Sequence, residues 1–307
     1  MALGSGFVPA MRVIPDLGRP VEGVLWMLAS GLAFVGVNGV VRHLGTDLPA
    51  AQSAFIRFAL GLVILFPVLW GLRGTRFSPE VLRLFGWRGL LHVAAVVFWF
   101  YAMARVPVAE MAAIGFLSPV IVLVIAGVSL GEGMTLPRIF AVAVALAGAL
   151  VVLRPGLREV TEGHLAQLVA TLCFAVSYIF AKRLSALAPA GTVVAVLSVT
   201  VTLGLAPLAW WQWQPVRGDQ LAWLALVAAL ATGGHYAMTR AFRADPLAVT
   251  QPVTFVQLVW AAMLGALVFD EAVDGFVLTG GAMIILAITA HTVFEARRER
   301  VVAVSEP

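Results

Sequence analysis

The sequence predicts an all-α, polytopic membrane protein with ten transmembrane helices in two inverted five-helix repeats. Composition is the first reason: 61% of the 307 residues are hydrophobic and 12% are charged, about half the charged fraction of an ordinary soluble domain. The second reason is that apolar runs of the roughly 20 residues needed to cross a bilayer recur along the chain. The third is that the two halves of the chain match each other.

The gaps between the apolar runs are short and leave no room for a soluble domain. Because the runs are continuous, they favour helices over barrel strands, in which apolar and polar residues alternate. In chain order, the predicted helices cover residues 22–41, 50–70, 88–104, 107–130, 138–154, 163–181, 190–211, 219–239, 246–269 and 275–294.

Basic residues set the predicted orientation through the positive-inside rule. With the N-terminus in the cytoplasm, fourteen Lys and Arg residues, Arg88 among them, fall on the cytoplasmic side, five fall outside, and Arg57 alone lies in the membrane. Residues 1–21, which lack the apolar core of a secretory signal, and the tail 295–307 are both expected in the cytoplasm. Nineteen Arg against one Lys favours a GC-rich bacterial genome and hence the bacterial inner (plasma) membrane.

The orientation accounts for the basic charge, so a pI near 10 does not indicate a nucleic-acid partner. Nucleotide hydrolysis is not expected, because the sequence has no GxxxxGK[ST] motif. Cys173 is the single cysteine, which excludes an intrachain disulfide and a cysteine-based metal site. We expect no cofactor, metal or catalytic residue; the expected partners are a small-molecule substrate and the lipid bilayer, with a monomer as the working state.

An internal repeat is visible when the chain is compared with itself. Residues 25–44 match 165–184, which pairs Phe34 with Phe174, and residues 106–132 match 245–271. Five helices per half force the second half to run opposite to the first. The motifs YAMAR (101–105) and YAMTR (236–240) align only when the chain is shifted by about one helical turn less than the other matches require. Either a one-turn insertion or coincidence explains this difference.

Together these features resemble the drug/metabolite transporter superfamily, in the group built from two EamA-type repeats. The resemblance rests on FIRFALGLVILF (55–66), LSPVIVLVIAGVSLGE (117–132) and FVQLVWAAMLGALVFDE (255–271), and on the Gly-bearing last helix of each half. It implies repeats at 22–154 and 163–294. Asp270 stands where the family often has Gly, and Leu258 stands where the first half has Pro119, which weakens the symmetry of the helix ends.

The resemblance implies export of small amphiphilic metabolites by alternating access, with aromatic or hydrophobic amino acids as the leading substrates. A multidrug or other metabolite transporter of the same superfamily is the alternative. An intramembrane enzyme would need clustered catalytic groups such as HExxH, and a channel would need rings of like charge; the sequence offers neither. Without a carboxylate near the membrane midplane, facilitated export is favoured, and proton coupling stays open.

In inverted-repeat carriers the substrate site lies near the midplane, beside helices interrupted by Gly or Pro. Gly115 and Pro119, Gly233-Gly234 and Pro252 therefore predict helices 3, 4, 8 and 9 as the cavity wall, although such prolines also occur as packing kinks. Polar and aromatic residues at helical spacing supply the candidate substrate contacts. These are Asn38, His92, Trp99, Ser118, Tyr178, His235, Tyr236, Thr254 and Gln257.

Each candidate also has a plain structural reading. The polar groups could join helices by hydrogen bonds, a histidine could be a packing residue, and Trp99 or Tyr236 could face lipid. Arg57 is either a gate or partner for a substrate carboxylate, or a side chain that snorkels or bonds nearby carbonyls. Glu271 is expected at a membrane face, where it would meet the start of the following helix.

Overall fold

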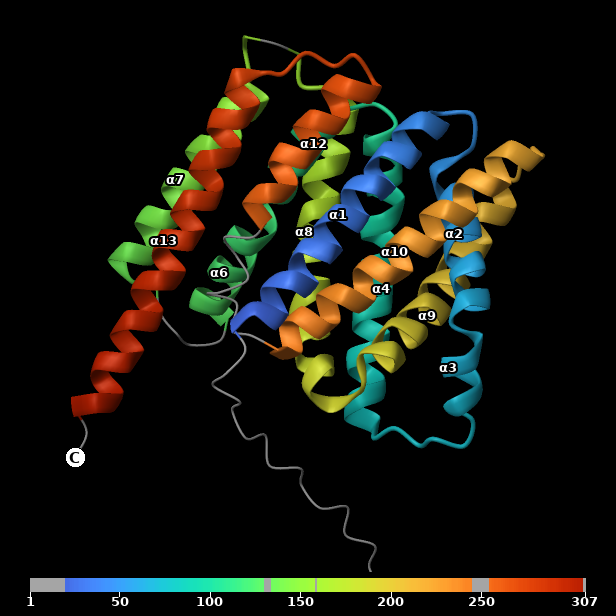
Figure 1. The fold of residues 1–307 in the computed structure, drawn as a ribbon, viewed down its shortest axis with the longest axis horizontal. Coiled ribbons are helices and arrows are strands. Elements are labelled where there is room, and N and C mark those ends of the chain that lie inside the picture. The colour runs from blue at the N-terminus through green and yellow to red at the C-terminus, as the bar shows by residue number, and fades with distance from the viewer. Residues whose placement is uncertain (1–19, 130–133, 158, 245–253, 306–307) are drawn as a thin grey trace, which may run out of the picture.

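The computed structural model describes residues 20–129, 134–157, 159–244 and 254–305, and every regular element in these ranges is a helix (Figure 1). The helix bounds are α1 Pro20–Leu44, α2 Ala50–Ile64, α3 Phe66–Gly71, α4 Pro79–Met103, α5 Val108–Gly115, α6 Leu117–Ser129, α7 Leu136–Leu153, α8 Glu162–Leu187, α9 Ala190–Trp211, α10 Gly218–Ala244, α12 Thr254–Val268 and α13 Gly275–Ser305. The described residues contain eight helical segments long and apolar enough to span a membrane, of which Val108–Ile125 runs through both α5 and α6; Ala50–Ile64 and Val256–Val268 are shorter apolar helices.

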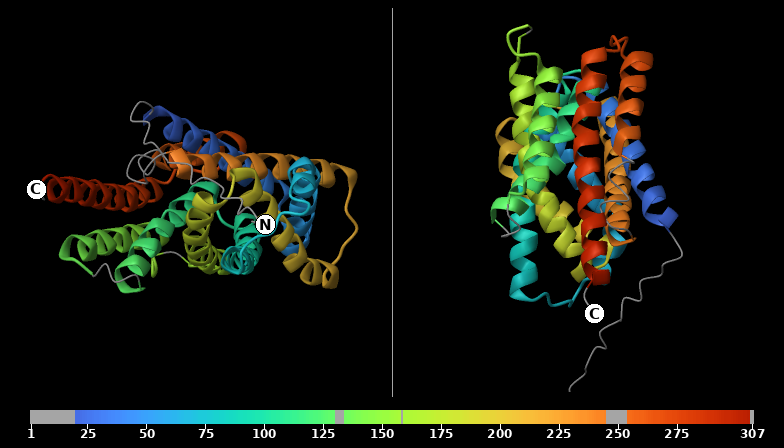
Figure 2. Two further views of the ribbon diagram at one scale, coloured as in Figure 1. Left: turned by 90° about the horizontal axis from the view of Figure 1, so that it is seen from below. Right: turned by 90° about the vertical axis from the view of Figure 1, so that its left-hand side faces the viewer.

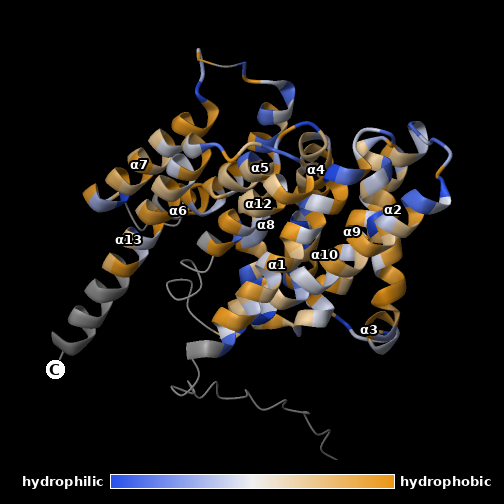
Figure 3. Cartoon of the chain, turned by 45° about the horizontal axis from the view of Figure 1, so that its top comes forward, coloured by the Kyte–Doolittle hydropathy of each residue, from blue (hydrophilic) through white to orange (hydrophobic). Residues whose placement is uncertain are grey.

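Hydrophobic residues, drawn in orange, predominate along the helices of the bundle (Figure 3), and many of them are exposed. Leu136, Phe140 and Leu203 are between 68% and 79% exposed, which would be unfavourable in water and is expected against lipid chains. The polytopic fold class predicted from composition is therefore confirmed.

Two predicted helices are each divided in the structure. The second becomes α2 and α3, which meet at Leu65, and the fourth becomes α5 and α6, which meet at Phe116. Pro67 and Pro119 lie just after these breaks, and a proline cannot donate to the carbonyl four residues earlier. The interruption expected at Gly115 and Pro119 is thus present, whereas Pro252 lies outside the described residues.

The third helix begins earlier than the hydrophobic run predicts. It was expected at 88–104, but α4 begins at Pro79, with the hydroxyl of Ser78 accepting from the Val81 N–H. Nine residues of additional helix place Arg88 one turn before His92 inside the bundle, where it is 1% exposed. The assignment of Arg88 to the cytoplasmic side, with Arg57 as the lone membrane arginine, was therefore wrong.

The two repeats exchange packing partners. A shift of 140 residues relates α1 to α8, and a similar shift relates α4 to α10. The structure packs α1 on α10 and α4 on α8, so each of these interfaces is the image of the other. At opposite sides of the bundle, the pairs α2–α9 and α7–α13 likewise join one repeat to the other (Figure 1; Figure 2 gives two further views).

The shared YAM motifs lie at opposite ends of the bundle, and each contacts a glutamate of the other repeat. The Tyr101 hydroxyl donates to Glu162 over 2.7 Å, and Arg105 lies 3.8 Å above the Tyr101 ring. In the other repeat, Arg240 contacts Tyr236 and donates to Glu22 over 3.0 Å. Glu22 and Glu162 both lie in the first turn of their helices, 140 residues apart. The motifs are therefore structurally equivalent, which favours the one-turn insertion over coincidence.

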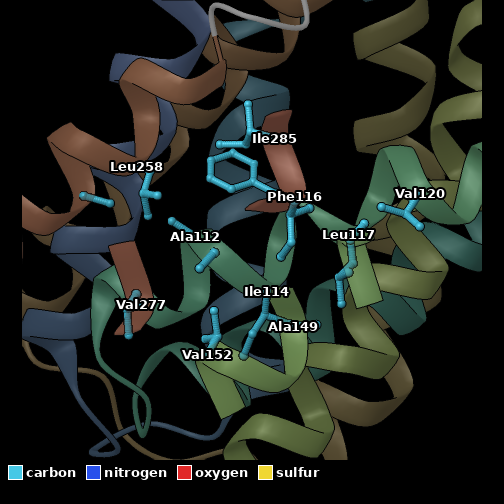
Figure 4. Close-up of a cluster of buried hydrophobic side chains, with 14 of the residues drawn as sticks. Ala112, Ile114, Phe116, Leu117, Val120, Ala149, Val152, Leu258, Val277 and Ile285 are labelled. Carbon is cyan, nitrogen blue, oxygen red and sulfur yellow. The ribbon is translucent and has the colours of Figure 1, made fainter. Parts of the chain in front are cut away.

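A tight core closes the side of the bundle formed by α5, α7, α12 and α13 (Figure 4). Phe116, Leu258 and Ile285 fill its centre, and all three are at least 90% buried. Here α7 and α13 approach so closely that a Cβ built on Gly148 would lie 2.6 Å from the Gly280 carbonyl oxygen. The glycines seen in the last helix of each half serve this close approach.

Candidate functional site at the centre of the bundle

A continuous chain of rings crosses the centre of the bundle. Phe34 of α1 meets His235 of α10 at 5.0 Å between ring centroids, and His235 meets His92 of α4 at 5.3 Å. His92 meets Phe174 of α8 at 5.1 Å, and Phe174 stacks on Tyr178 at 5.9 Å. Because Phe34 and Phe174 are the pair matched by the repeat, each imidazole receives the edge of an equivalent ring.

Polar groups around the two imidazoles are only partly satisfied. His92 Nδ1 lies 3.3 Å from the Ser177 hydroxyl, which also donates to the Arg88 carbonyl over 3.5 Å. Within the described residues, His92 Nε2, His235 Nδ1 and the Thr232 hydroxyl are buried without a hydrogen-bond partner. Buried polar atoms are rarely left unpaired, which makes these three atoms unusual within the bundle.

Two arginines add positive charge to the same centre. Arg57 of α2 is 5% exposed, and its guanidinium carbon lies 3.7 Å from the centroid of Phe58, whose ring in turn meets His92 at 6.1 Å. Arg88 donates to the Val193 carbonyl over 3.2 Å. Both arginines lie within electrostatic range of both imidazoles. At 5% exposure, Arg57 stays inside the bundle and does not snorkel to the membrane surface.

A second polar group surrounds the break between α5 and α6. Gln167 of α8 donates to the Met111 carbonyl over 3.2 Å, and Ser118 donates to the Thr171 carbonyl over 3.4 Å. On the other side of the two-fold, Gln257 of α12 packs against Gly31 of α1. Since the repeat pairs Ser118 with Gln257 and Thr171 with Gly31, these two contacts occupy equivalent places in the two repeats.

The remaining predicted contacts lie apart from the ring chain. Trp99 is half-buried against Phe100, and Tyr236 is 37% exposed beside Trp26, near the end of the bundle where α1 begins. Asn38 is buried one turn beyond Phe34 on α1. Thr254 begins α12, but its side chain lies outside the described residues. Of the nine predicted contacts, the structure joins His92, His235 and Tyr178, and the substrate role of all nine stays a prediction.

The predicted wall of helices 3, 4, 8 and 9 corresponds to α4, α5–α6, α10 and α12. Of these helices, only α4 and α10 contribute to the ring chain. The other rings of the chain come from α1 and α8, and α2 places Arg57 and Phe58 beside it. Arg88, Phe34, Phe58, Phe174 and Ser177 were missed as site residues. The match between Phe34 and Phe174 was the one signal in the sequence that could have identified them.

Charged side chains gather at the end of the bundle away from the chain termini. Glu110 and His164 are both buried and lie 2.9 Å apart. Glu271 accepts from the Val108 N–H over 2.9 Å and pairs with Arg42 at 3.1 Å. Glu271 therefore caps the start of α5 in the other repeat, rather than meeting the helix that follows it. A cavity of about 1220 Å³ opens beside these groups, between α5, α7, α12 and α13, and it does not include the imidazole pair.

Asp274 lies in the loop before α13 at this end. Its partial burial opposes ionisation, but the Phe276 N–H, over 2.8 Å, and the Arg154 guanidinium both donate to the carboxylate. These donors outweigh burial and hold the pKa of Asp274 below its ordinary value. The ionised form is therefore the one that ties this loop to Arg154 at the end of α7.

Comparison with known proteins finds one family twice along the chain. The model described as the EamA-like transporter family matches residues 21–154 and residues 161–292. A riboflavin transporter of Vibrio cholerae is 30% identical over 92% of this chain and 96% of its own length. The pseudopaline exporter CntI of Pseudomonas aeruginosa is 24% identical over 88% and 95%, and an S-adenosylmethionine uptake transporter of Rickettsia prowazekii is 24% identical over 91% and 94%.

A solved crystal structure also resembles this chain. It superposes with a TM-score of 0.61 at 19% identity and covers 90% of this chain and 98% of the other. At this identity the likeness concerns the fold alone.

Proposed function

Because the chain belongs to the EamA-like transporter family, we propose that it carries small amphiphilic metabolites with a planar ring across the membrane through the centre of the bundle. The chain of rings through His92 and His235 is the observation that carries this proposal. Aromatic side chains stack on planar molecules, while the unpaired imidazole nitrogens can hydrogen-bond their polar edges. Export of aromatic amino acids is the case that the sequence resemblance implies.

A flavin is the second candidate. The relative that is 30% identical over nearly its whole length is named a riboflavin transporter, and a flavin also has a planar ring with polar edges. Relatives include both an exporter and an uptake transporter, so the direction of transport is part of what an assay has to measure.

Alternating access is the proposed mechanism, with the repeats 22–154 and 163–294 rocking about the ring chain. The exchanged packing of α1 on α10 and α4 on α8 supports it, because a tilt that opens one interface at one end would close its image at the other. We place the protein in the bacterial inner membrane with both termini in the cytoplasm, and we propose facilitated transport by a monomer.

Counterflow in proteoliposomes tests the proposal. Vesicles loaded with unlabelled tryptophan, phenylalanine or riboflavin are diluted into the same radiolabelled compound, with and without a pH gradient. We expect saturable accumulation of at least one ring compound over empty vesicles and over non-aromatic threonine. His235→Ala should reduce it, whereas Gly233→Ala, at an open position two residues away, should not. Equal counterflow of all compounds, or of none, would contradict the proposal.

A further inference from the structure

The central cluster carries positive charge that its protein neighbours do not neutralise. Arg57 and Arg88 are almost fully buried, and guanidinium groups remain protonated in proteins. Arg57 contacts the face of Phe58, and Arg88 donates to a backbone carbonyl. In the described ranges neither guanidinium pairs with a carboxylate, whereas Arg42 and Arg240 both do, with Glu271 and Glu22.

The two charges act at one place. The guanidinium carbon of Arg57 lies 3.7 Å from the centroid of the Phe58 ring, and this ring meets His92 at 6.1 Å between centroids. Arg88 lies one turn before His92 on α4, and the Ser177 hydroxyl that contacts His92 also donates to the backbone carbonyl of Arg88. Charged side chains within a membrane span are strongly unfavourable, and they mark substrate or ion pathways. A pair of them without an acid points to a negative group that arrives from outside the chain.

On the basis of the proposed function, we propose that the ring-bearing molecule is a net anion, and that Arg57 and Arg88 bind its carboxylate or phosphate group. The planar guanidinium fork matches both oxyanions and binds them by charge-assisted hydrogen bonds. The rings of Phe58, His92 and Phe174 beside these charges hold the planar part of the same molecule.

The described part of the central cluster contains no Asp or Glu, which favours an anionic substrate over a zwitterionic one. The ammonium group of an amino acid would need an acceptor of negative charge near the arginines. Among the described residues, the buried acid of the spans is Glu110, and its carboxylate already contacts His164 near the end of the bundle. A free amino acid would therefore bind more weakly than its deaminated analogue, and an amine with the same ring would bind most weakly.

Binding measured with matched probes tests the charge. Isothermal titration calorimetry of the full chain is done in phosphatidylcholine nanodiscs, which contain no anionic lipid. One series compares anionic indole-3-acetate, zwitterionic tryptophan and cationic tryptamine. The other compares anionic flavin mononucleotide with uncharged riboflavin, and Kd is measured for each compound. We expect the anion in at least one ring series to bind at least about tenfold more tightly than its uncharged, zwitterionic or cationic analogue, the scale of a hydrogen bond to a charged group.

Three variants connect the preference to Arg57. Arg57→Gln should remove most of the tenfold preference, and Arg57→Lys, which keeps the charge, should retain it. Arg76→Gln, at an exposed position in the loop before α4, should behave like the wild type. If Arg57→Gln does not yield a monodisperse protein, Arg57→Lys and the wild-type probe series still decide the question.

The outcomes separate this inference from the proposed function. Equal Kd values for anionic and neutral probes, or tighter binding of tryptamine, would overturn the anion assignment and leave ring transport intact. An anion preference that survives in Arg57→Gln would also overturn the role given to Arg57. Inorganic phosphate that binds as tightly as flavin mononucleotide would overturn the ring part of the proposal. If no ring compound binds and counterflow is absent, the proposed function and this inference both fail.

Discussion

The contact between α7 and α13 gives a sharp prediction about stability. Gly148 faces the backbone of α13, and a Cβ at this position would lie 2.6 Å from the Gly280 carbonyl oxygen and 3.0 Å from side-chain atoms of Met283 and Ile284. Real Cβ atoms essentially never approach another atom closer than 3.0 Å. Gly148→Ala therefore requires the two helices to separate by about 0.4 Å along a contact where a backbone atom cannot rotate away.

The expected penalty is that of overpacking, about 1–3 kcal/mol. Gly233→Ala in α10 is the matched control, because a Cβ there meets nothing within 4 Å. Both substitutions gain the same helix preference of alanine over glycine, so the difference between the two variants isolates the clash.

Unfolding by SDS titration in mixed micelles, followed by circular dichroism, measures this difference. We expect Gly148→Ala to be less stable than Gly233→Ala by about 1–3 kcal/mol. Equal stability of the two variants would show that α7 and α13 do not approach each other as closely as described, and would refute the reasoning.

Two further predictions concern the ends of the bundle. If the repeats rock, loss of a contact between them should open the end at which it lies, as read by alkylation of a reporter Thr232→Cys in a chain with Cys173→Ala. Tyr101→Phe, which removes the hydrogen bond to Glu162, should raise alkylation from the end away from the termini, and Glu22→Gln, which removes the ion pair with Arg240, should raise it from the other end. Each change should be roughly two- to fivefold for a partly exposed hydrogen bond or ion pair, and equal effects at both ends would contradict rocking. Asp274→Asn should lower the thermal midpoint at pH 7. Because the folded pKa of Asp274 is depressed, its stabilisation is present above the ordinary pKa of about 4 and is lost as pH falls through the folded value. The gap to wild type should therefore close in acid; a gap that stays constant with pH would contradict the ion-pair role.

The helices of this fold were predictable because a bilayer demands long apolar runs and short connections. The break near Gly115 was predictable for a similar local reason, since Pro119 cannot complete the hydrogen bond to the Gly115 carbonyl. Local rules failed at the start of α4. There the polar first turns hid nine residues of helix, and Arg88 was placed outside the membrane.

The site itself was only partly predictable. His92 and His235 were found because histidines within apolar spans are unusual, but their ring contacts depend on how α4 and α10 cross, which no residue spacing reports. Tyr236 was chosen for its position next to His235, yet adjacent residues on a helix point about 100° apart, and Tyr236 faces Trp26 instead. The unpaired charge of Arg57 and Arg88 became visible only when their surroundings were known.

The exchange of packing partners between the repeats also constrains how the chain is made. The surfaces of α1 and α4 that end up against α10 and α8 leave the ribosome long before those partners exist. Between the starts of α1 and α10 lie about 200 residues, and between those of α4 and α8 about 80. At roughly 5–20 residues per second, these separations correspond to delays of roughly 10–40 s and roughly 4–16 s. During these intervals the second-repeat helices that bury the arginines of α2 and α4 are still missing. Assembly therefore requires the first five helices to stay near the insertion machinery until the second five are made.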